Sequence, residues 1–505
     1  MNKPMQIGFN TFDTHVIDKD PDFILPLKNG VDFIFCHFDP PKWKFDSCEE
    51  KAAAAVAVLK ELGLPFVANF EFQNFARDTY VDGYEWSNRP DGTHLLDMKP
   101  SFFEALRSQG NLLAVTYDEF EHVIINRNIS LWLDSKGKVD LAAFPQLDTR
   151  DAFRQGEALE TDLKAYADAL KSMGAPAVSG EHVWPVLHHL FARAGIIPNF
   201  KSQKELVSNI HFAVAAGAAL EYGTPLWNCV DLWHKMTFPG HTPEEMYHNL
   251  VFAYLAGVDR VYVEASNAFV EDDGEGGKKL NAYGENYLRF TDKYKGKERD
   301  YNVQDYRPEI GVIRYDDTYW GQNLVWDRGL FGNRKIRPNA RSKEWLHIIK
   351  TVTHGDTRST GFTWGRIAPS ALTPHRSFVS MNSLAVFDDR VKKETLKSLK
   401  LCFLCGVRVS PETLSAVDEL VSENGLTVVC PRRYAPARYR SLLKKDYTEL
   451  SCGKGSYIIT DNFESARLRN RIAPFLGNKD EIRLTFKDRE IRLKIDEKGE
   501  TFTQI

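Results

Sequence analysis

Short apolar runs that end in an acidic residue recur along the first part of this 505-residue chain. Four of them follow a segment patterned as a helix, and in each the acid comes six or seven residues after the run begins. They are "LPFVANFE" to Glu71, "APAVSGE" to Glu181, "TPLWNCVD" to Asp231 and "VDRVYVE" to Glu264. Such a run, without polar alternation, is typical of a strand buried on both faces in a parallel sheet that helices cover.

The segments between the runs carry the signals of amphipathic helices. Residues 151–172 repeat apolar side chains at helical spacing, and "TPEEMYHNLVFAYLAG" opens with Thr242 as N-cap and Pro243 at the first helical position. The segment "SQKELVSNIHFAVAAGAALEYG" opens with Ser202 and Glu205 in capping-box spacing, which predicts a helix that starts at Ser202. Apolar strands therefore alternate with helices.

Four further runs complete a set of eight: "QIGFNTF", "VDFIFCHF", "LLAVTYDEFEH" and "IIPNFK", the last as an irregular strand. Eight strands over about 265 residues is the size of a (β/α)8 TIM barrel. The C-terminal strand ends of such a barrel open into one bowl where active sites are built, so the acids are expected to gather there. A single acid after a strand could be there only because the loop is exposed to solvent. Acids after several strands are not explained in this way, because most loops would supply Gly, Ser or Asn as readily.

The run "LLAVTYDEFEH" ends in Asp118, Glu119, Glu121 and His122, which crowds three carboxylates at one strand end. Neighbouring acids raise one another's pKa, so this crowd is a direct way to keep one carboxyl group protonated. Asp118 and Glu119 follow one another on a strand, and we therefore expect only one of them to face the bowl. We choose Glu119 as the general acid/base.

Large aromatic side chains follow the same strand ends. Carboxylates with aromatic platforms suit a sugar site, because rings stack on apolar C–H faces while acids accept hydrogen bonds from hydroxyls. The catalytic candidates are Glu119, Glu181 and Glu264, and the spacing leaves open whether Glu181 or Glu264 partners Glu119. The residues expected to bind substrate are Glu71, Asp118, His182, Trp184, Trp227, Asp231 and Trp233. For Trp227, in the middle of a run, packing inside the barrel is an equal alternative.

The second part of the chain predicts a different fold. The charged stretch "DKYKGKERDYNVQDYRP" predicts a solvated linker, and "LKLCFLCGVRVSPETLSAVDELVSENGLTVVC" predicts a strand, a helix with Ser410 as N-cap, and a second strand. We expect a catalytic barrel over 1–300, an open flavodoxin-like or amidotransferase-like α/β domain over 308–477, and a small β-meander over 478–505.

This order of domains resembles the layout of the microbial β-galactosidases whose middle domain serves in trimerisation. The stretch "RVSPETLSAVDELVSENGLTVV" is similar to the strand–helix–strand of that middle domain. The wider clan places an Asn-Glu pair after the fourth strand and a Glu after the seventh, where this chain has Asp118-Glu119 and Asp231. The resemblance implies a glycoside hydrolase acting on a carbohydrate, with its acid second in the pair, and a homo-oligomer, dimer or trimer. The chain lacks the G-x-C-x-G turn of amide hydrolases, so the middle domain is expected to serve assembly.

Composition further limits the partners and the cellular location that we expect for this protein. The 65 Lys and Arg nearly balance the 69 Asp and Glu, without a basic stripe, so nucleic acid is not an expected partner. No window approaches the roughly 18 apolar residues of a membrane span, and seven cysteines suit reduced, buried thiols, so we expect a cytoplasmic protein without a membrane partner. No Cys/His cluster or phosphate loop predicts a metal or an organic cofactor.

Two other classes stay open at this point. A metal-dependent sugar isomerase or epimerase on the same barrel would use Glu181, His182, Asp231 and Glu264 as ligands. A sugar-binding protein without catalysis would keep the acids as hydrogen-bonding groups only.

Overall fold

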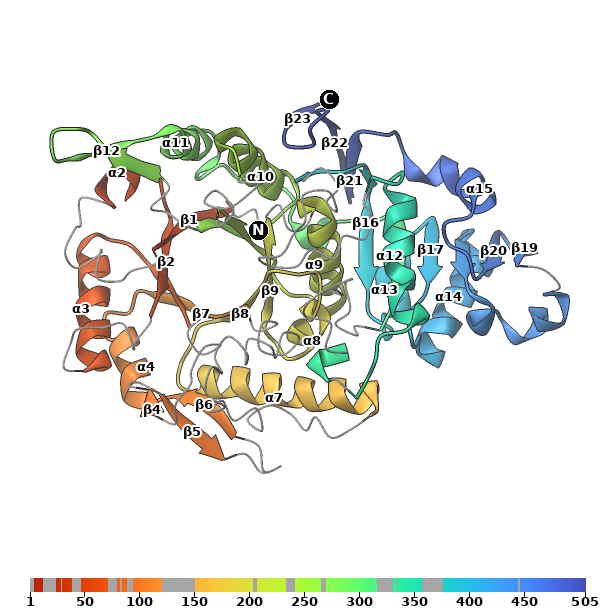
Figure 1. Ribbon diagram of the computed structural model, residues 1–505, viewed down its shortest axis with the longest axis horizontal. Helices are drawn as coiled ribbons and strands as arrows, with labels where there is room; N and C mark the ends of the chain where they lie inside the picture. The colour runs from red at the N-terminus through yellow and green to blue at the C-terminus, as the bar shows by residue number, and fades with distance from the viewer. Residues whose placement is uncertain are drawn as a thin grey trace.

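The first part of the structure is a closed barrel of eight parallel strands, as the sequence predicted. The structure is a computed structural model, and it describes residues 4–11, 24–28, 30–38, 47–70, 80–81, 84–88, 94–119, 150–202, 207–232, 241–264, 269–315, 330–333, 335–356, 376–443 and 446–505. The barrel strands are β1 (Gln6–Thr11), β2 (Phe33–His37), β3 (Phe66–Asn69), β7 (Leu112–Asp118), β8 (Val178–His182), β9 (Ile197–Ser202), β10 (Trp227–Asp231) and β11 (Arg260–Glu264). Each pairs with the next barrel strand, and β11 closes the ring on β1 (Figure 1).

Helices surround the barrel, and two of the three helices whose signals the sequence shows, over 151–172 and after Thr242, begin where predicted. They are α2 (Leu25–Lys28), α3 (Cys48–Glu61), α4 (Pro100–Arg107), α7 (Ala152–Ser172), α8 (His188–Arg193), α9 (Ser208–Tyr222), α10 (Pro243–Leu255) and α11 (Ala282–Tyr294). The capping box of Thr242 and Glu245 is present at α10. The predicted helix start at Ser202 is wrong, because Ser202 ends β9, where it pairs with Val230 and its hydroxyl accepts from Asn228.

Two small antiparallel sheets are inserted in the chain after barrel strands. A three-stranded antiparallel sheet of β4 (Tyr80–Val81), β5 (Tyr84–Asn88) and β6 (His94–Met98) lies between β3 and β7 in the chain. A hairpin of β12 (Val270–Asp272) and β13 (Lys278–Leu280) follows β11.

Apolar side chains fill the lower part of the barrel interior. This cluster consists of Phe33, Phe35, Val67, Ala114, Trp227, Cys229 and Tyr262. Tyr262 stacks on Phe35 with ring centroids 4.0 Å apart. This packed layer forms an apolar floor below the polar side chains at the C-terminal strand ends.

The second part contains the open sheet that the sequence predicted. Its strands are β14 (Ile310–Ile313), β16 (Leu384–Phe387), β17 (Leu401–Leu404), β18 (Thr427–Cys430), β19 (Tyr447–Cys452) and β20 (Gly455–Thr460). They lie in the order β16-β14-β17-β18-β20-β19, with only β19 antiparallel, which is the doubly wound pattern. Its helices are α12 (Ala340–Val352), α13 (Lys393–Leu396), α14 (Pro411–Asn424) and α15 (Ala466–Leu476), with short 3-10 turns at Val303–Asp305, Leu330–Gly332, Arg432–Tyr434 and Ala437–Leu442. Ser410 caps α14 as predicted.

The C-terminal β-meander also forms, and it gains a strand from elsewhere in the chain. β21 (Glu481–Phe486), β22 (Arg489–Ile495) and β23 (Phe502–Gln504) are antiparallel neighbours. β15 (Met381–Asn382), which precedes the open sheet's β16, pairs with β21 in parallel. The segment before β16 thus ties this small sheet to the rest of the molecule.

The predicted solvated linker is wrong, because the chain after α11 packs onto the barrel. Arg299 is buried and donates to the carbonyl oxygens of Tyr254 and Val258. Tyr301 and Tyr306 are also buried. Long side chains with polar ends can bury their apolar stems while their charged groups bond to the backbone. The high charge density of the segment therefore did not mean that it is exposed to solvent.

Helix α9 joins the barrel to the open sheet (Figure 1). Residues 208–219 are all buried, since one side of the helix faces the barrel and another faces the edge strand β16. The backbone of β16 finds partners on the barrel side: the Val386 carbonyl contacts His189 Nε2 at 3.0 Å, and Asp388 N donates to Glu221 at 3.0 Å. The barrel therefore covers this edge of the sheet.

The seven cysteines are all buried, and none of them forms a disulfide bond in the structure. No described helix combines the length and the apolar character needed to cross a membrane. Within the described residues, β19 has no neighbouring strand on its outer side. The homo-oligomer expected from the sequence stays a prediction.

Replacing Gly217 by Ala tests the contact between α9 and β16. A Cβ atom at position 217 would lie 1.8 Å from the Val386 carbonyl oxygen, so one element must shift. We expect a loss of about 1–3 kcal/mol in the free energy of unfolding, the usual range for overpacking. Denaturant titration measures it. In an uncrowded helix interior the same change would stabilise by about 1 kcal/mol, so a gain in stability would contradict this close approach.

Candidate active site

Every barrel strand contributes one buried polar side chain to a single layer at the C-terminal mouth. In strand order these are Asn10, His37, Asn69, Asp118, Glu181, Lys201, Asp231 and Glu264. Neighbours in the layer contact one another: Asn10 Nδ2 lies 2.8 Å from His37 Nε2, and Asn69 Nδ2 lies 3.2 Å from the same nitrogen. Asn69 also donates to Asp118 Oδ2 at 2.7 Å. The layer is a closed polar belt above the apolar floor.

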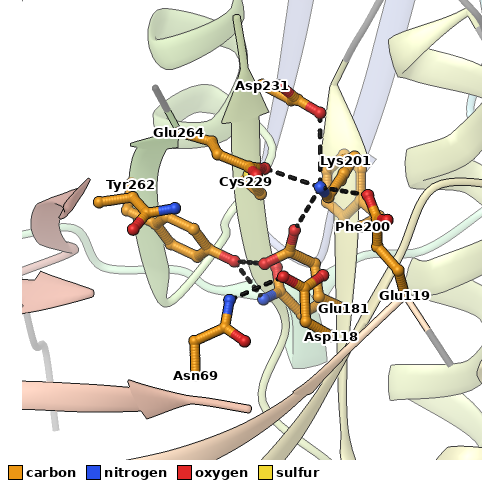
Figure 2. A network of polar contacts seen from close by, with 12 residues as sticks. Asn69, Asp118, Glu119, Glu181, Phe200, Lys201, Cys229, Asp231, Tyr262 and Glu264 are labelled. Atoms are coloured by element: carbon orange, nitrogen blue, oxygen red, sulfur yellow. Dashed lines mark hydrogen bonds and ion pairs between the residues drawn. The ribbon is translucent and has the colours of Figure 1, made fainter. Parts of the chain in front are cut away.

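Lys201 is the centre of this belt (Figure 2). Its Nζ lies 2.7 Å from Glu119 Oε1, 2.9 Å from Glu181 Oε1, 2.7 Å from Glu264 Oε2 and 3.4 Å from Asp231 Oδ2. The ammonium is almost completely enclosed. Four carboxyl groups from β7, β8, β10 and β11 thus converge on one cation that β9 supplies.

The charges in the belt shift one another's proton affinity. Burial alone would lower the pKa of Lys201, but the four carboxylates raise it well above its usual range. Burial and the charge of Asp118 raise the pKa of Glu181, and burial and the charge of Asp231 raise that of Glu264. The site therefore contains a permanent cation and at least two carboxyl groups that hold their protons more tightly than usual.

Glu119 reaches Lys201 because the backbone leaves the strand conformation there. Its φ of 49° lies in the left-handed region, which is uncommon for glutamate. The Glu119 amide still donates to the Glu181 carbonyl at 3.0 Å, so the bend follows directly on the strand ladder. Asp118 and Glu119 both face the mouth, and the expectation that only one of them would is wrong. Alternation holds only while the chain stays extended.

A second layer supports the belt from below. Tyr262 donates its hydroxyl to Glu181 Oε2, and Asn199 Nδ2 donates to the Tyr262 oxygen at 2.9 Å. Cys229 Sγ lies 3.3 Å from Glu264 Oε2. Glu181 and Glu264 are thus held between Lys201 and the layer beneath it, which fixes the direction in which each carboxyl group points.

The structure brings together most of the acids that the sequence selected: Asp118, Glu119, Glu181, Asp231 and Glu264. Glu71, Glu121, His122 and Trp233 lie outside the described residues. His182 follows Glu181 on β8 and faces outward, where its ring lies 4.3 Å from that of His188. A metal set that joins His182 to Glu181 and Glu264 is therefore wrong.

Of the tryptophans selected from the sequence, the two that the structure describes do not line the belt. Trp227 is the first residue of β10, at the opposite end of the strand from Asp231, and the Arg260 guanidinium lies 4.6 Å from its ring. It belongs to the barrel interior, the alternative that the sequence left open. Trp184, which follows β8 in the chain, is buried in the main hydrophobic core. Neither is carried forward as a substrate platform.

Lys201 is the residue that the sequence reasoning missed. It ends the run "IIPNFK", at the same strand-end position as the selected acids. The search asked for acids after apolar runs and so passed over a basic residue. Asn10, His37 and Asn69 were missed for the same reason. Strand-end position, rather than residue type, was the signal that would have found them.

Comparison with known proteins gives similarity in fold only. No family model matches the chain, and no curated protein does. Among solved structures, a family 5 glycoside hydrolase from Streptomyces cattleya, in complex with Manβ1-4GlcNAc, is 14% identical, with 68% of this chain and 91% of that chain covered and a TM-score of 0.39. The endo-β-1,4-mannanase of Thermotoga petrophila is 10% identical, with 62% and 82% covered and a TM-score of 0.36.

An enzyme of another class is also among the matches. The YdjI aldolase of Escherichia coli K12 is 10% identical, with 52% of this chain and 75% of that chain covered and a TM-score of 0.28. Similarities of this size carry no argument about activity.

Replacing Lys201 by Met tests whether its ammonium holds the belt together. Removing one partner of a buried ion pair typically costs about 3–5 kcal/mol, so we expect a loss of that order in the free energy of unfolding at pH 8. Without the cation the carboxyl pKa values rise further in the folded state, so the folded variant gains stability relative to the parent as pH falls. Urea unfolding at pH 8 and pH 5 measures the difference in the free energy of unfolding between parent and variant. This difference should be smaller at pH 5.

Lys393→Met is the matched control, since the Lys393 ammonium pairs with Glu419 and Glu423 on the surface. This variant should not change the free energy of unfolding measurably at pH 8 or at pH 5. A cost for Lys201→Met that is equal at both pH values would contradict the electrostatic role.

Proposed function

We propose that the chain is a glycoside hydrolase that cleaves an O-glycosidic bond in an oligosaccharide or glycoconjugate. One observation carries the proposal: carboxyl groups from four barrel strands meet around Lys201 within hydrogen-bonding distance of one atom. Glycoside hydrolysis needs a carboxylic acid that keeps its proton and a carboxylate that does not, facing one another across the scissile bond. The raised pKa values of Glu181 and Glu264 make these two the candidates for the group that keeps its proton.

Glu119 and Glu264 are the pair that a substrate would meet first. Their side chains are 17% and 8% exposed, compared with 1% for Glu181 and 4% for Asp231. Glu181 lies deeper and is held from below by Tyr262. We therefore assign the reaction to Glu119 and Glu264, and leave Glu181 and Asp231 to orient Lys201.

The spacing of this pair favours retention of configuration. Glu119 Oε1 and Glu264 Oε2 both lie 2.7 Å from the same nitrogen, so these oxygens cannot be farther apart than twice that distance. Inverting enzymes hold their carboxyl groups about 6.5–9.5 Å apart to admit a water molecule, whereas retaining enzymes hold them about 5–5.5 Å apart. The shorter spacing suits a covalent glycosyl intermediate.

The charges around the pair suggest which member holds the proton. Burial and the charge of Asp231 raise the pKa of Glu264, which favours Glu264 as the member that holds the proton. Both members contact the Lys201 ammonium at the same distance, but Glu119 is the more exposed, so we assign the carboxylate role to Glu119. This assignment changes the role of Glu119, which the sequence analysis expected to be the general acid/base.

The reaction then runs in two steps. Glu264 gives its proton to the leaving oxygen as the bond from the anomeric carbon to that oxygen breaks, and a Glu119 oxygen forms a bond to the same carbon. In the second step Glu264 takes a proton from water, and the water oxygen displaces Glu119. Lys201 contacts both carboxyl groups, so its positive charge balances the negative charge that moves from one to the other.

Alanine variants of the two residues separate their roles. With an activated aryl glycoside, Glu264→Ala should keep much of its first step, whereas a substrate with a poor leaving group should lose about 10²–10⁴-fold in turnover. Added azide should give glycosyl azide of retained configuration with Glu264→Ala and of inverted configuration with Glu119→Ala, because azide takes the place of the missing group. NMR of the product reports the configuration.

The control for these assays is Glu285→Ala, an exposed glutamate on α11 that should behave like the parent. Exchange of the two azide products would show that the roles are reversed. Full activity of both variants would place the chemistry elsewhere, and sugar binding by the parent without turnover would favour a non-catalytic protein.

A metal-dependent sugar isomerase or epimerase is the second candidate, and one observation supports it. His37, Asp118 and Glu264 bring ligand atoms within 4.8 Å of one another, as do Glu181, Cys229 and Glu264. Hard divalent cations prefer such oxygen-rich sets. The Lys201 ammonium, however, already lies where a cation would contact Glu181 and Glu264 together. We therefore rank the hydrolase first.

Metal analysis decides between these two candidates. The hydrolase proposal predicts that aryl glycoside cleavage is the same before and after EDTA treatment, because its groups act without a Lewis acid. Elemental analysis of protein purified without added metal should then find less than one divalent ion per chain. Stoichiometric manganese, cobalt or zinc, with conversion of a free sugar that EDTA abolishes, would favour the isomerase.

A further inference from the structure

Cys229 lies inside the barrel, in the row of residues below the belt. It pairs in register with Lys201 on β9 and with Tyr262 on β11, and its side chain is completely buried. Its Sγ lies 3.3 Å from Glu264 Oε2, and Figure 2 shows the two side chains next to each other. The thiol therefore contacts the proposed acid from below, away from the barrel mouth.

The Lys201 ammonium donates to the same oxygen of Glu264. An ammonium group has three N–H donors. Lys201 Nζ makes hydrogen bonds to Glu119 Oε1 and Glu264 Oε2, both at 2.7 Å, and a longer one to Asp231 Oδ2 at 3.4 Å. One N–H is therefore directed at Glu264 Oε2, in addition to the thiol of Cys229.

These two donors leave one oxygen of Glu264 available. A carboxyl oxygen offers two lone pairs, and the N–H of Lys201 and the S–H of Cys229 occupy both of them on Oε2. A proton bound to Oε2 would have to displace one of these donors. Oε1 makes no hydrogen bond with any residue that the structure describes, and the Glu264 side chain is 8% exposed. When Glu264 holds a proton, Oε1 is therefore the oxygen that carries it.

Glu181, the other belt glutamate with a raised pKa, has a different arrangement of donors. Its Oε2 accepts from the Tyr262 hydroxyl, and its Oε1 lies 2.9 Å from the Lys201 ammonium. Each oxygen of Glu181 thus faces a donor group, and the side chain is only 1% exposed. On Glu264 both donors meet a single oxygen. The layer beneath the belt therefore leaves Glu264, and not Glu181, with an oxygen that can meet a substrate.

The Cys229 thiol is the donor in its contact with Glu264. Burial raises the pKa of this thiol well above its ordinary value, and the charges of Glu181 and Glu264 act in the same direction. A thiol that keeps its proton can donate, whereas a thiolate could only accept. Because sulfur is a weak donor, the contribution of this hydrogen bond to catalysis is expected to be modest.

We propose that Cys229 is a positioning residue for the general acid: together with Lys201 it occupies Oε2 of Glu264, so that Oε1 carries the proton and faces the substrate. The role in catalysis rests on the proposed function of Glu264, whereas the contact between the two side chains does not. Oε1 gives its proton to the leaving oxygen in the first step and takes one from water in the second. The two donors stay on Oε2 throughout.

The first test observes the S–H bond and needs no enzymatic activity. Thiol S–H stretching absorbs in an infrared region that is free of other protein bands, and a hydrogen bond to oxygen lowers its frequency. The difference spectrum between the parent and Cys229→Ala isolates the Cys229 band from those of the other cysteines. We expect this band at a lower frequency than that of ethanethiol in hexane. In a Glu264→Leu background the same difference should place it at a higher frequency than in the parent.

The matched control is a Glu285→Leu background, in which an exposed glutamate of α11 is removed and the band should stay where it is in the parent. If Cys229→Ala does not fold, Cys229→Ser gives the same difference spectrum. A parent band at the frequency of ethanethiol in hexane, or a band that Glu264→Leu leaves unchanged, would overturn the proposal.

The second test separates the donor from the volume of the side chain. Cys229→Ser keeps a donor, and Cys229→Val fills the space without one. With a methyl glycoside, which has a poor leaving group, kcat of Cys229→Val should fall about two- to tenfold, the usual contribution of one hydrogen bond. Cys229→Ser should keep most of the kcat of the parent. With the 4-nitrophenyl glycoside of the same sugar, which needs little protonation, kcat/KM should change less in both variants.

A packing role would give the opposite order, because valine is closer to cysteine in volume than serine is. Equal kcat for the two variants on the methyl glycoside, or a higher kcat for Cys229→Val, would therefore overturn the positioning role. If the parent cleaves no glycoside at all, the proposed function fails. The infrared spectra would then still decide whether Cys229 donates to Glu264.

Discussion

The ion pairs of Lys201 are the interaction on which the barrel mouth depends. A parallel barrel brings the ends of all its strands to one opening, and in this chain several of those ends carry acids. Unpaired carboxylates in a buried layer would repel one another and would be poorly solvated. One ammonium within reach of four of them makes the arrangement compatible with folding. Burial and neighbouring charges raise the pKa values of Glu181 and Glu264, and the same cation acts in the opposite sense on both.

The main features of the fold could be predicted from the sequence. Most of the barrel strands lie in short runs rich in apolar residues, and such runs are visible because both faces of each strand are buried. The strand–helix–strand unit around Ser410 was equally visible, because its cap, proline and glycine are local signals. Local signals failed where tertiary packing decided. Ser202 has the spacing of a capping box but pairs in β9, and Arg299 and Tyr301 look solvated in sequence yet pack on the barrel.

The site was predicted in part, for reasons that particular residues show. Asp118, Glu181, Asp231 and Glu264 could be placed because each ends a predicted strand. Lys201 ends one as well, but a rule built on acids could not select it. The positive φ of Glu119 depends on how the chain leaves β7, which no pattern of hydrophobic residues encodes. The roles of the acids also depend on burial and on distances to Lys201, which only the folded chain defines.

The left-handed backbone at Glu119 has a consequence for how this chain responds to selection. Glycine and asparagine adopt such a conformation more easily than glutamate does, so the residue that the backbone prefers differs from the residue that the carboxylate belt contains. A library sorted for thermal stability alone should therefore drift toward glycine or asparagine at this position, and a library sorted for turnover should return to glutamate. The residue found at position 119 would then show whether a population of such sequences had been selected for stability or for turnover.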